Sequence, residues 1–333
     1  MLQNDIYKRQ LLLYSITKKR EKNARQEIDD ICLKKYNDFK EKFKTCNVNI
    51  PKYADIEKTK LYFCYQLTHF CDIKRLQPQI VECAIVLYNR FYLKEIILEY
   101  DPRILIFTCI ILAIKLEGYG RLYKINEFFS DIDINLDKVL EHENVVCSSL
   151  DFELNFLYTK ECIFYLKNQF LNYINKYINK DNEVKNSFEN ICDKIYVSTS
   201  LECLKLLENF FITFTYTPAQ IALYCFINNI KINFNIVNAD KFILEFITNN
   251  NQILFQKLKN KIDELHIKYK DHFDLRNTFD DENTTKQIGE TLDMCIDIYD
   301  ILKKKKSHKK SKKNKLNNED NEQNESKKMA SIK

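Results

Sequence analysis

The chain has 333 residues, of which 45% are hydrophobic and 30% are charged, which is typical of a globular protein with room for two domains. It contains only three Gly and four Pro, so the composition favours long helices joined by short connections. Residues 303–333 hold twelve Lys against four Asp or Glu, so the net charge of +5 leaves the other 302 residues at −3. This slightly acidic body argues against a nucleic-acid-binding platform.

The sequence carries no motif for catalysis or metal binding. Its twelve cysteines are scattered without a CxxC pair or the Cys/His spacing of a zinc site, which indicates free, buried thiols in a reducing compartment. It has no glycine-rich phosphate loop, no HExxH and no GxSxG, and its five histidines stand alone. We therefore expect no cofactor, no metal and no catalytic residues. Acidic and basic residues precede any apolar run at the start of the chain, so no secretory signal peptide is expected.

Helical periodicity runs through most of the chain. Pro78 suits the first turn of one expected helix, and Asp101 with Pro102 predicts an N-cap and a first-turn proline at the start of the next. Gly118 is placed to end that second helix. In chain order, the expected helices cover about residues 3–43, 55–71, 75–93, 102–117, 125–132, 135–154, 160–177, 184–209, 217–229, 239–249, 251–270 and 286–302.

Two of these helices are apolar on every side. The stretches DPRILIFTCII (101–111) and TPAQIALYCFI (217–227) both begin with a capping residue and a proline, and Thr217 with Gln220 matches the capping-box pattern. A helix that is apolar all round must be surrounded by other helices. Because the flanking helices repeat in the same order, the sequence predicts two all-helical domains, each built around one central helix.

Two isolated charges lie on apolar faces. Lys115 follows the uncharged run 104–114 in the last turn of its helix, where the helix dipole favours a cation. Glu143 falls within the apolar stripe of the helix at 136–150, where an acid calls for a partner. Two interpretations are open. The two side chains form an internal salt bridge that closes the domain, or both point at a groove and hydrogen-bond the backbone of another protein.

The motifs around these charges resemble the cyclin family. FYLKEIILEYDPRILIFTCIILAIKLEG is similar to the first cyclin box, in particular that of the H branch, and VLEHENVVCSSLDFEL continues the likeness. TPAQIALYCFI is similar to the matching helix of the second box, and KRQLLLYS to the start of the N-terminal helix of that branch. The resemblance implies an all-α fold of two tandem five-helix cyclin boxes with flanking N- and C-terminal helices. The implied domains are an N-terminal helical segment at 1–50, the first box at 51–157, the second box at 158–270, a linker and C-terminal helix at 271–302, and a disordered Lys/Asn-rich tail at 303–333.

The resemblance also implies a function without catalysis, in which the chain binds a cyclin-dependent kinase and stabilises the active position of its C-helix. Lys115 and Glu143 match the family's lysine–glutamate pair, which hydrogen-bonds backbone at that helix. Leu116 stands where cyclins place an apolar contact, and Cys147, one turn after Glu143, is a weaker candidate. The H branch implies a CDK-activating kinase, with a RING-finger assembly subunit and transcription factor IIH as further partners.

Two positions depart from the family pattern. Gly118 replaces the second acid that often follows the lysine, and Asn89 stands where cell-cycle cyclins have an aspartate paired with an arginine. The missing pair argues against a mitotic-type cyclin. The alternatives left open are a transcription-type cyclin (C, K or T) that serves a polymerase II tail kinase, an assembly scaffold without a kinase, and a transcription factor IIB-like binding protein. The last would need a zinc ribbon and a basic body, and the sequence has neither.

The lysine-rich run near the C-terminus predicts a nuclear localisation signal. A contact with nucleic acid and a solvated low-complexity tail are the alternatives. We therefore expect the protein in the nucleus, with the cytoplasm as a second location. The lysines of the candidate signal are Lys303, Lys304, Lys305, Lys306, Lys309, Lys310, Lys312 and Lys313.

Overall fold

The computed structural model describes residues 24–44, 48–177, 182–233 and 238–304. Within these ranges the regular secondary structure is entirely helical, which confirms the all-α prediction. The expected N-terminal helix before residue 24, with its KRQLLLYS motif, lies outside the described residues, and so does the tail from residue 305 onward.

The first bundle is built around a central apolar helix, as predicted. Helix α5 packs against α3, α4 and α7, and its residues 109–111, 113 and 114 are fully buried. Burying each of the isoleucines among them contributes about 1.5 to 3 kcal/mol, so α5 is an important part of the core of this bundle. The bundle consists of α3 (Tyr53–Ile73), α4 (Pro78–Lys94), α5 (Pro102–Leu116), α6 (Ile125–Phe128) and α7 (Leu136–Ser149).

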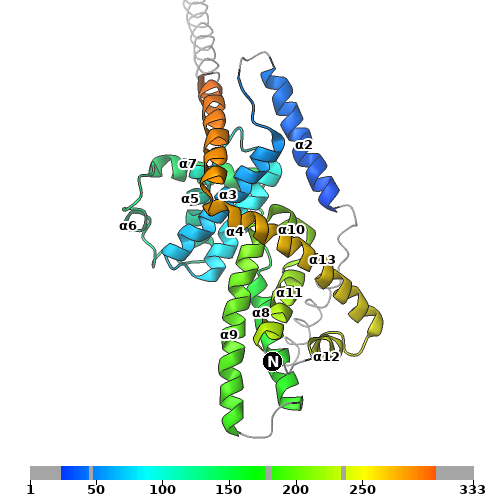
Figure 1. Ribbon diagram of the computed structural model, residues 1–333. Coiled ribbons are helices and arrows are strands. Elements are labelled where there is room, and N and C mark those ends of the chain that lie inside the picture. Colours follow the sequence, from blue (N-terminus) through cyan, green and yellow to red (C-terminus); the bar gives the residue numbers. More distant parts are fainter. Residues whose placement is uncertain (1–23, 45–47, 178–181, 234–237, 305–333) are drawn as a thin grey trace, which may run out of the picture.

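The second bundle repeats this plan around α11 (Figure 1), which packs against α8, α9 and α13. Its residues 221–227 are almost completely buried. The predicted repeat of the two apolar helices is therefore present in three dimensions. The bundle consists of α8 (Thr159–Tyr177), α9 (Asn182–Leu207), the short α10 (Phe210–Thr215), α11 (Pro218–Asn233), α12 (Ala239–Phe242), which continues as the π-helical turn η1 (Ile243–Ile247), and α13 (Gln252–Arg276).

The local signals at the ends of the two central helices act as the sequence predicts. The Asp101 side chain accepts a hydrogen bond from the Arg103 backbone N–H at 3.0 Å, and Gly118 has a φ of +77° just beyond the end of α5. At the start of α11, the Thr217 N–H donates to the Gln220 side chain at 3.0 Å, and the Gln220 N–H donates back to the Thr217 hydroxyl at 3.3 Å. This is a complete capping box.

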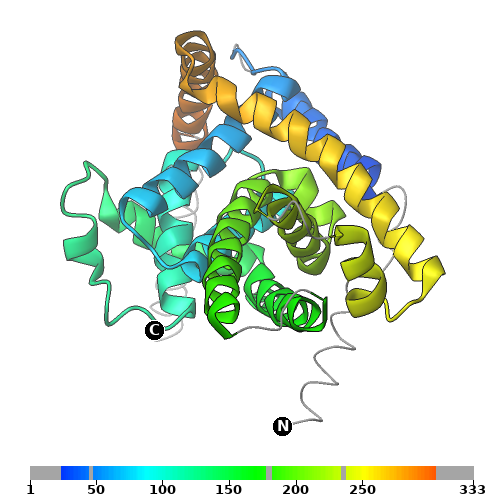
Figure 2. The ribbon, with the colours of Figure 1, turned by 60° about the horizontal axis from the view of Figure 1, so that its bottom comes forward.

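Flanking helices cover both bundles. Helix α2 (Ala24–Phe43) packs on α10, where Ile28, Cys32 and Phe210 form a small cluster of their own. At the other end of the chain, α13 leads into the turn η2 (Asn277–Asp280) and then into a helix at 282–304. Figure 2 shows α13 running along the outside of the second bundle towards the first.

The boundaries near the C-terminus differ from those expected. Helix α13 extends past residue 270 to Arg276, and the last helix begins at residue 282 rather than 286. The reason is Phe279, which is buried against the rings of Tyr62 and Tyr65 on α3 and holds the polar segment close to the first bundle. Further along, the Tyr299 hydroxyl donates to the backbone carbonyl of Ile97. These contacts attach the C-terminal helix to the first bundle.

The eleven cysteines in the described part of the chain are free thiols, and most of them are buried. In the same ranges, no helix combines the length and the hydropathy that a membrane crossing needs.

Candidate functional site

Lys115 and Glu143 meet at the edge between α5 and α7. The Lys115 ammonium lies 2.7 Å from both carboxylate oxygens of Glu143. The Lys115 side chain is 43% exposed and that of Glu143 17% exposed, so solvent reaches the pair. An ion pair this open contributes only about 0.2 to 1 kcal/mol to stability. The ion pair therefore contributes little to the stability of the first bundle.

The pair leaves hydrogen-bonding capacity unused. A lysine ammonium has three donors and a carboxylate about four acceptor positions, and one ion pair fills only part of each set. In the isolated chain, the two side chains form the internal salt bridge that was the first of the two interpretations. Their exposure also leaves them accessible to the backbone of a partner, so the second interpretation stays a prediction.

Each of the two helices also carries an exposed leucine near its charged residue. Leu116, next to Lys115, is 40% exposed, and Leu140, one helical turn before Glu143, is 36% exposed. We call Lys115, Leu116, Leu140 and Glu143, together with Phe152 described below, the α5–α7 surface. Cys147 lies one turn beyond Glu143 but is half buried, and burial raises the pKa of its thiol. Cys147 therefore supports this surface from below more than it presents a contact of its own.

Phe152 is an exposed aromatic residue just beyond the end of α7, and the sequence patterns did not single it out. It is 68% exposed, and its backbone N–H donates to the Cys147 carbonyl at 2.8 Å, which places it directly beyond the end of α7. Phe152 and Asp151 have φ values of +58° and +54°, a left-handed conformation that bulky residues rarely adopt. Such strain costs on the order of 1 to 3 kcal/mol per residue and concentrates at functional sites. A large aromatic held outward in this way is suited to contact a partner.

Asn89 connects the two bundles. Its side chain is buried, and its Nδ2 donates to the backbone carbonyl of Leu207 at 2.9 Å and to the Thr213 hydroxyl at 3.4 Å. The position that carries an ion pair in the sequence pattern of cell-cycle cyclins therefore carries a neutral amide here. It joins α4 to the end of α9 in place of a bond within the first bundle.

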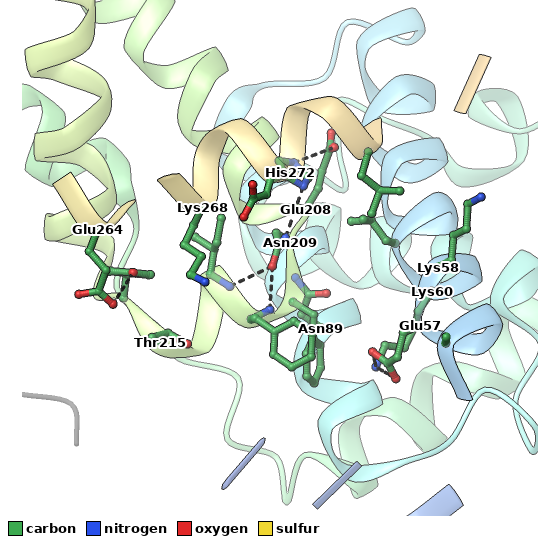
Figure 3. Close-up of a pocket in the computed structure, with 18 residues that line it drawn as sticks. Glu57, Lys58, Lys60, Asn89, Glu208, Asn209, Thr215, Glu264, Lys268 and His272 are labelled. Carbon is green, nitrogen blue, oxygen red and sulfur yellow. Dashed lines mark hydrogen bonds and ion pairs between the residues drawn. The ribbon is translucent and has the colours of Figure 1, made fainter. Parts of the chain in front are cut away.

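A pocket of about 590 Å³ opens between α3, α10 and α13 (Figure 3), and the sequence did not predict it. Its charged side chains are largely paired with one another or with neighbours. Lys60 lies 2.8 Å from Glu57, and buried Glu208 lies 2.9 Å from Arg276. Burial raises the pKa of Glu208 to about 7. The pocket belongs to the packing between the bundles and shares no residue with the α5–α7 surface.

His272 in the same pocket is a structural residue. Its Nε2 lies 2.7 Å from the Lys205 backbone carbonyl, and burial lowers the pKa of the imidazole to about 4. At neutral pH the ring is therefore uncharged and donates to that carbonyl. No group of His, Cys, Asp or Glu side chains within the described ranges is arranged to hold a metal ion.

Comparison with known proteins gives a consistent result. Residues 35–155 match the family model described as "Cyclin, N-terminal domain". Over 94 residues the chain is 33% identical to Cyclin mcs2 of Schizosaccharomyces pombe, and over 102 residues it is 28% identical to Cyclin-H of Xenopus laevis. Each match covers 28% of this chain and about three tenths of the relative, 29% and 31% respectively.

The fold is also found in a solved structure. A chain in the structure of the CAK complex from Chaetomium thermophilum bound to ATP-gamma-S matches with a TM-score of 0.62. The match covers 91% of this chain and 96% of that one at 15% sequence identity, so it concerns the fold alone.

Proposed function

We propose that the chain is a cyclin, that it is the regulatory subunit of a cyclin-dependent kinase, and that the α5–α7 surface contacts the C-helix of that kinase; the match of residues 35–155 to the cyclin N-terminal domain and the two cyclin relatives support this. The observation that carries the proposal is the solvent-accessible pair of Lys115 and Glu143, bordered by exposed apolar side chains. A surface of this kind offers apolar area for burial and a charged pair for orientation.

The mechanism is a shift in population. The catalytic lysine–glutamate pair of a kinase forms only when its C-helix is in the inward position. A rigid surface that binds this position better than the outward one stabilises it by the difference in binding free energy. Burial of exposed side chains such as Leu116 and Phe152 supplies most of that energy, at about 25 cal/mol per Å² of apolar area. Lys115 and Glu143 act mainly to fix the register, because both lose water on binding.

We place the chain in the H branch of cyclins, as part of a CDK-activating kinase that joins transcription factor IIH. Its similarity to Cyclin-H and Cyclin mcs2, and a fold shared with a chain of a CAK complex, support this placement. A RING-finger assembly subunit and a nuclear location follow from the same proposal. The alternative is a transcription-type cyclin that serves a polymerase II tail kinase.

The lysine-rich run remains a candidate nuclear localisation signal. Lys303 and Lys304 are exposed at the end of the C-terminal helix, and the other lysines of the run lie outside the described residues. Fusing residues 303–333 to a fluorescent reporter tests this part of the proposal. Nuclear accumulation of the reporter is expected, and an even distribution between nucleus and cytoplasm would contradict it.

Binding to purified cyclin-dependent kinases tests the main proposal. We expect the wild type to bind and activate one of them, and Lys115→Ala and Glu143→Ala each to weaken binding by tenfold or more. The matched control is Lys259→Ala, which removes an exposed interhelical ion pair to Asp240 in the second bundle, with side chains 41% and 52% exposed. If Lys115→Ala and Glu143→Ala bind and activate as well as the wild type, the site is wrong. If the wild type binds no kinase, the function is wrong.

A further inference from the structure

The two bundles are joined by three successive residues at the start of α8. Tyr158 donates its hydroxyl to the Glu117 carboxylate, Thr159 bonds Glu82, and the Lys160 ammonium donates to the side chain of Gln79. All three acceptors belong to the first bundle, where Gln79 and Glu82 lie on α4 and Glu117 follows α5. We call Glu82, Glu117, Tyr158 and Thr159 the inter-bundle clamp.

Glu82 caps helix α8 from outside that helix. One carboxylate oxygen accepts the Thr159 backbone N–H at 2.6 Å, and the other accepts the Thr159 hydroxyl at 2.9 Å. Both residues are buried, Glu82 being 4% exposed and Thr159 2% exposed. The first backbone N–H groups of a helix lack partners within it, and the Glu82 carboxyl supplies one. The bond therefore fixes the start of α8 against α4.

Tyr158 bonds the C-terminal end of α5. Its acceptor, Glu117, is the capping residue at the C-terminus of α5 and directly follows Lys115 and Leu116. Beyond Glu117 the chain turns at Gly118, and the backbone N–H groups of Gly118 and Tyr119 donate to the carbonyls of Lys115 and Ile114, so α5 ends in an ordered turn. These local bonds close the turn but do not attach it to a neighbouring helix. The Tyr158 hydroxyl makes that attachment, and it comes from the segment that Glu82 holds in place through Thr159.

We propose that Glu82, Tyr158 and Thr159 are positioning residues, which hold the C-terminal end of α5 so that Lys115 and Leu116 meet the kinase in one fixed geometry. This inference rests on the proposed function of the α5–α7 surface. It assigns to the second bundle a part in kinase activation, because the second bundle supplies the tyrosine that holds the contact residues of the first.

A double-mutant cycle with the partner kinase tests the inference. Tyr158→Phe removes only the hydroxyl, and we expect it to weaken kinase affinity about fivefold. In the Lys115→Ala background, the same substitution should weaken affinity less than twofold, because its effect passes through the end of α5. If Tyr158 contributes only to the general stability of the fold, the losses of kinase affinity caused by Tyr158→Phe and Lys115→Ala should instead multiply in the double mutant.

The second bundle offers a matched control. Tyr216 also donates its hydroxyl to a glutamate carboxylate, that of Glu264, at 2.9 Å. Tyr216→Phe should change kinase affinity less than twofold. Thr159→Val should weaken affinity as Tyr158→Phe does, and Thr159→Ser, which keeps the hydroxyl, should restore it.

Hydrogen exchange provides a measurement that needs no kinase. In Tyr158→Phe, the backbone amides of residues 113–118 should exchange at least fivefold faster, with the melting temperature unchanged within about 2 °C. Unchanged exchange there overturns the inference. If Lys115→Ala weakens kinase binding while Tyr158→Phe binds normally, or if the two effects multiply, the inference fails and the proposed function stands. If Lys115→Ala also binds normally, both fail.

Discussion

Replacing Glu82 with Gln should abolish a large part of the pH dependence of stability. The Glu82 carboxyl is fully buried, and desolvation raises its pKa from 4.5 to about 8. The folded chain therefore keeps a proton that the unfolded chain loses between pH 4.5 and 8, and the free energy of unfolding falls as the pH rises through that window. The slope approaches 1.4 kcal/mol per pH unit in the middle of this window, so the wild type loses about 2 to 3 kcal/mol between pH 5.5 and 7.5 from this group.

Glutamine preserves the two hydrogen bonds to Thr159 but does not titrate. Its amide oxygen accepts the Thr159 N–H, and its amide nitrogen donates to the Thr159 hydroxyl, so both hydrogen bonds have counterparts in the variant. Relative to the wild type, Glu82→Gln should therefore gain about 2 to 3 kcal/mol in the free energy of unfolding on going from pH 5.5 to pH 7.5. Other titrating groups, such as Glu208, are common to both chains and cancel in the difference.

Urea unfolding followed by circular dichroism at pH 5.5, 6.5 and 7.5 measures this difference. Glu202→Gln is the matched control, because Glu202 is a carboxylate of the second bundle with a pKa raised by burial, outside the clamp. The pH-dependent difference should be larger for Glu82→Gln than for this control. A difference between the wild type and Glu82→Gln that stays constant across the three pH values would refute the reasoning.

Three further substitutions are informative. Ile110→Ala, at a fully buried position in the middle of α5, should lower the free energy of unfolding by about 2 to 5 kcal/mol in urea titrations, and a loss below 1 kcal/mol would mean that α5 is not the core. Asn89→Leu removes one of the two donors to the Leu207 carbonyl, the other being the Thr213 hydroxyl, and should cost about 1 kcal/mol in the same assay; a neutral effect would show that the inter-bundle bond is dispensable. His272 is neutral in the folded chain, with a pKa of about 4 against an ordinary 6.5, so its contribution to stability is lost as the pH falls from 6.5 to 4. His272→Gln should therefore reduce the fall in the free energy of unfolding between pH 6.5 and 4, measured by urea titration. An unchanged fall would contradict the pKa assigned to the ring.

Much of the α5–α7 surface could be predicted because its signals are local. Asp101 and Pro102 define the start of α5, and the uncharged run that follows requires a buried helix. Lys115 and Glu143 each stand out against an apolar face, which is visible in the sequence alone. Spacing could not decide whether they bond each other or a partner, because that depends on the distance between two helices. The structure places the two side chains within 2.7 Å of each other.

Phe152 shows what local patterns miss. An aromatic residue in SLDFEL is as compatible with a buried position as with an exposed one, and only the left-handed backbone at Asp151 and Phe152 turns the ring outward. The same holds for the C-terminal boundary, where Phe279 packs on α3 and shortens an expected linker.

The amino-acid sequence by itself determined most of the helices, the caps of the two central helices and their apolar character, because each of these depends on residues within one or two turns of one another; the short α10 and several helix ends were not predicted. The tertiary structure alone decided the contacts between the bundles. Glu82 and Thr159 are 77 positions apart and Asn89 and Leu207 are 118 apart, and neither pair carries a periodic signal. Such polar pairs come together only when whole helices pack, since the burial of apolar faces sets the helix positions and buried polar groups must then find partners across the interface.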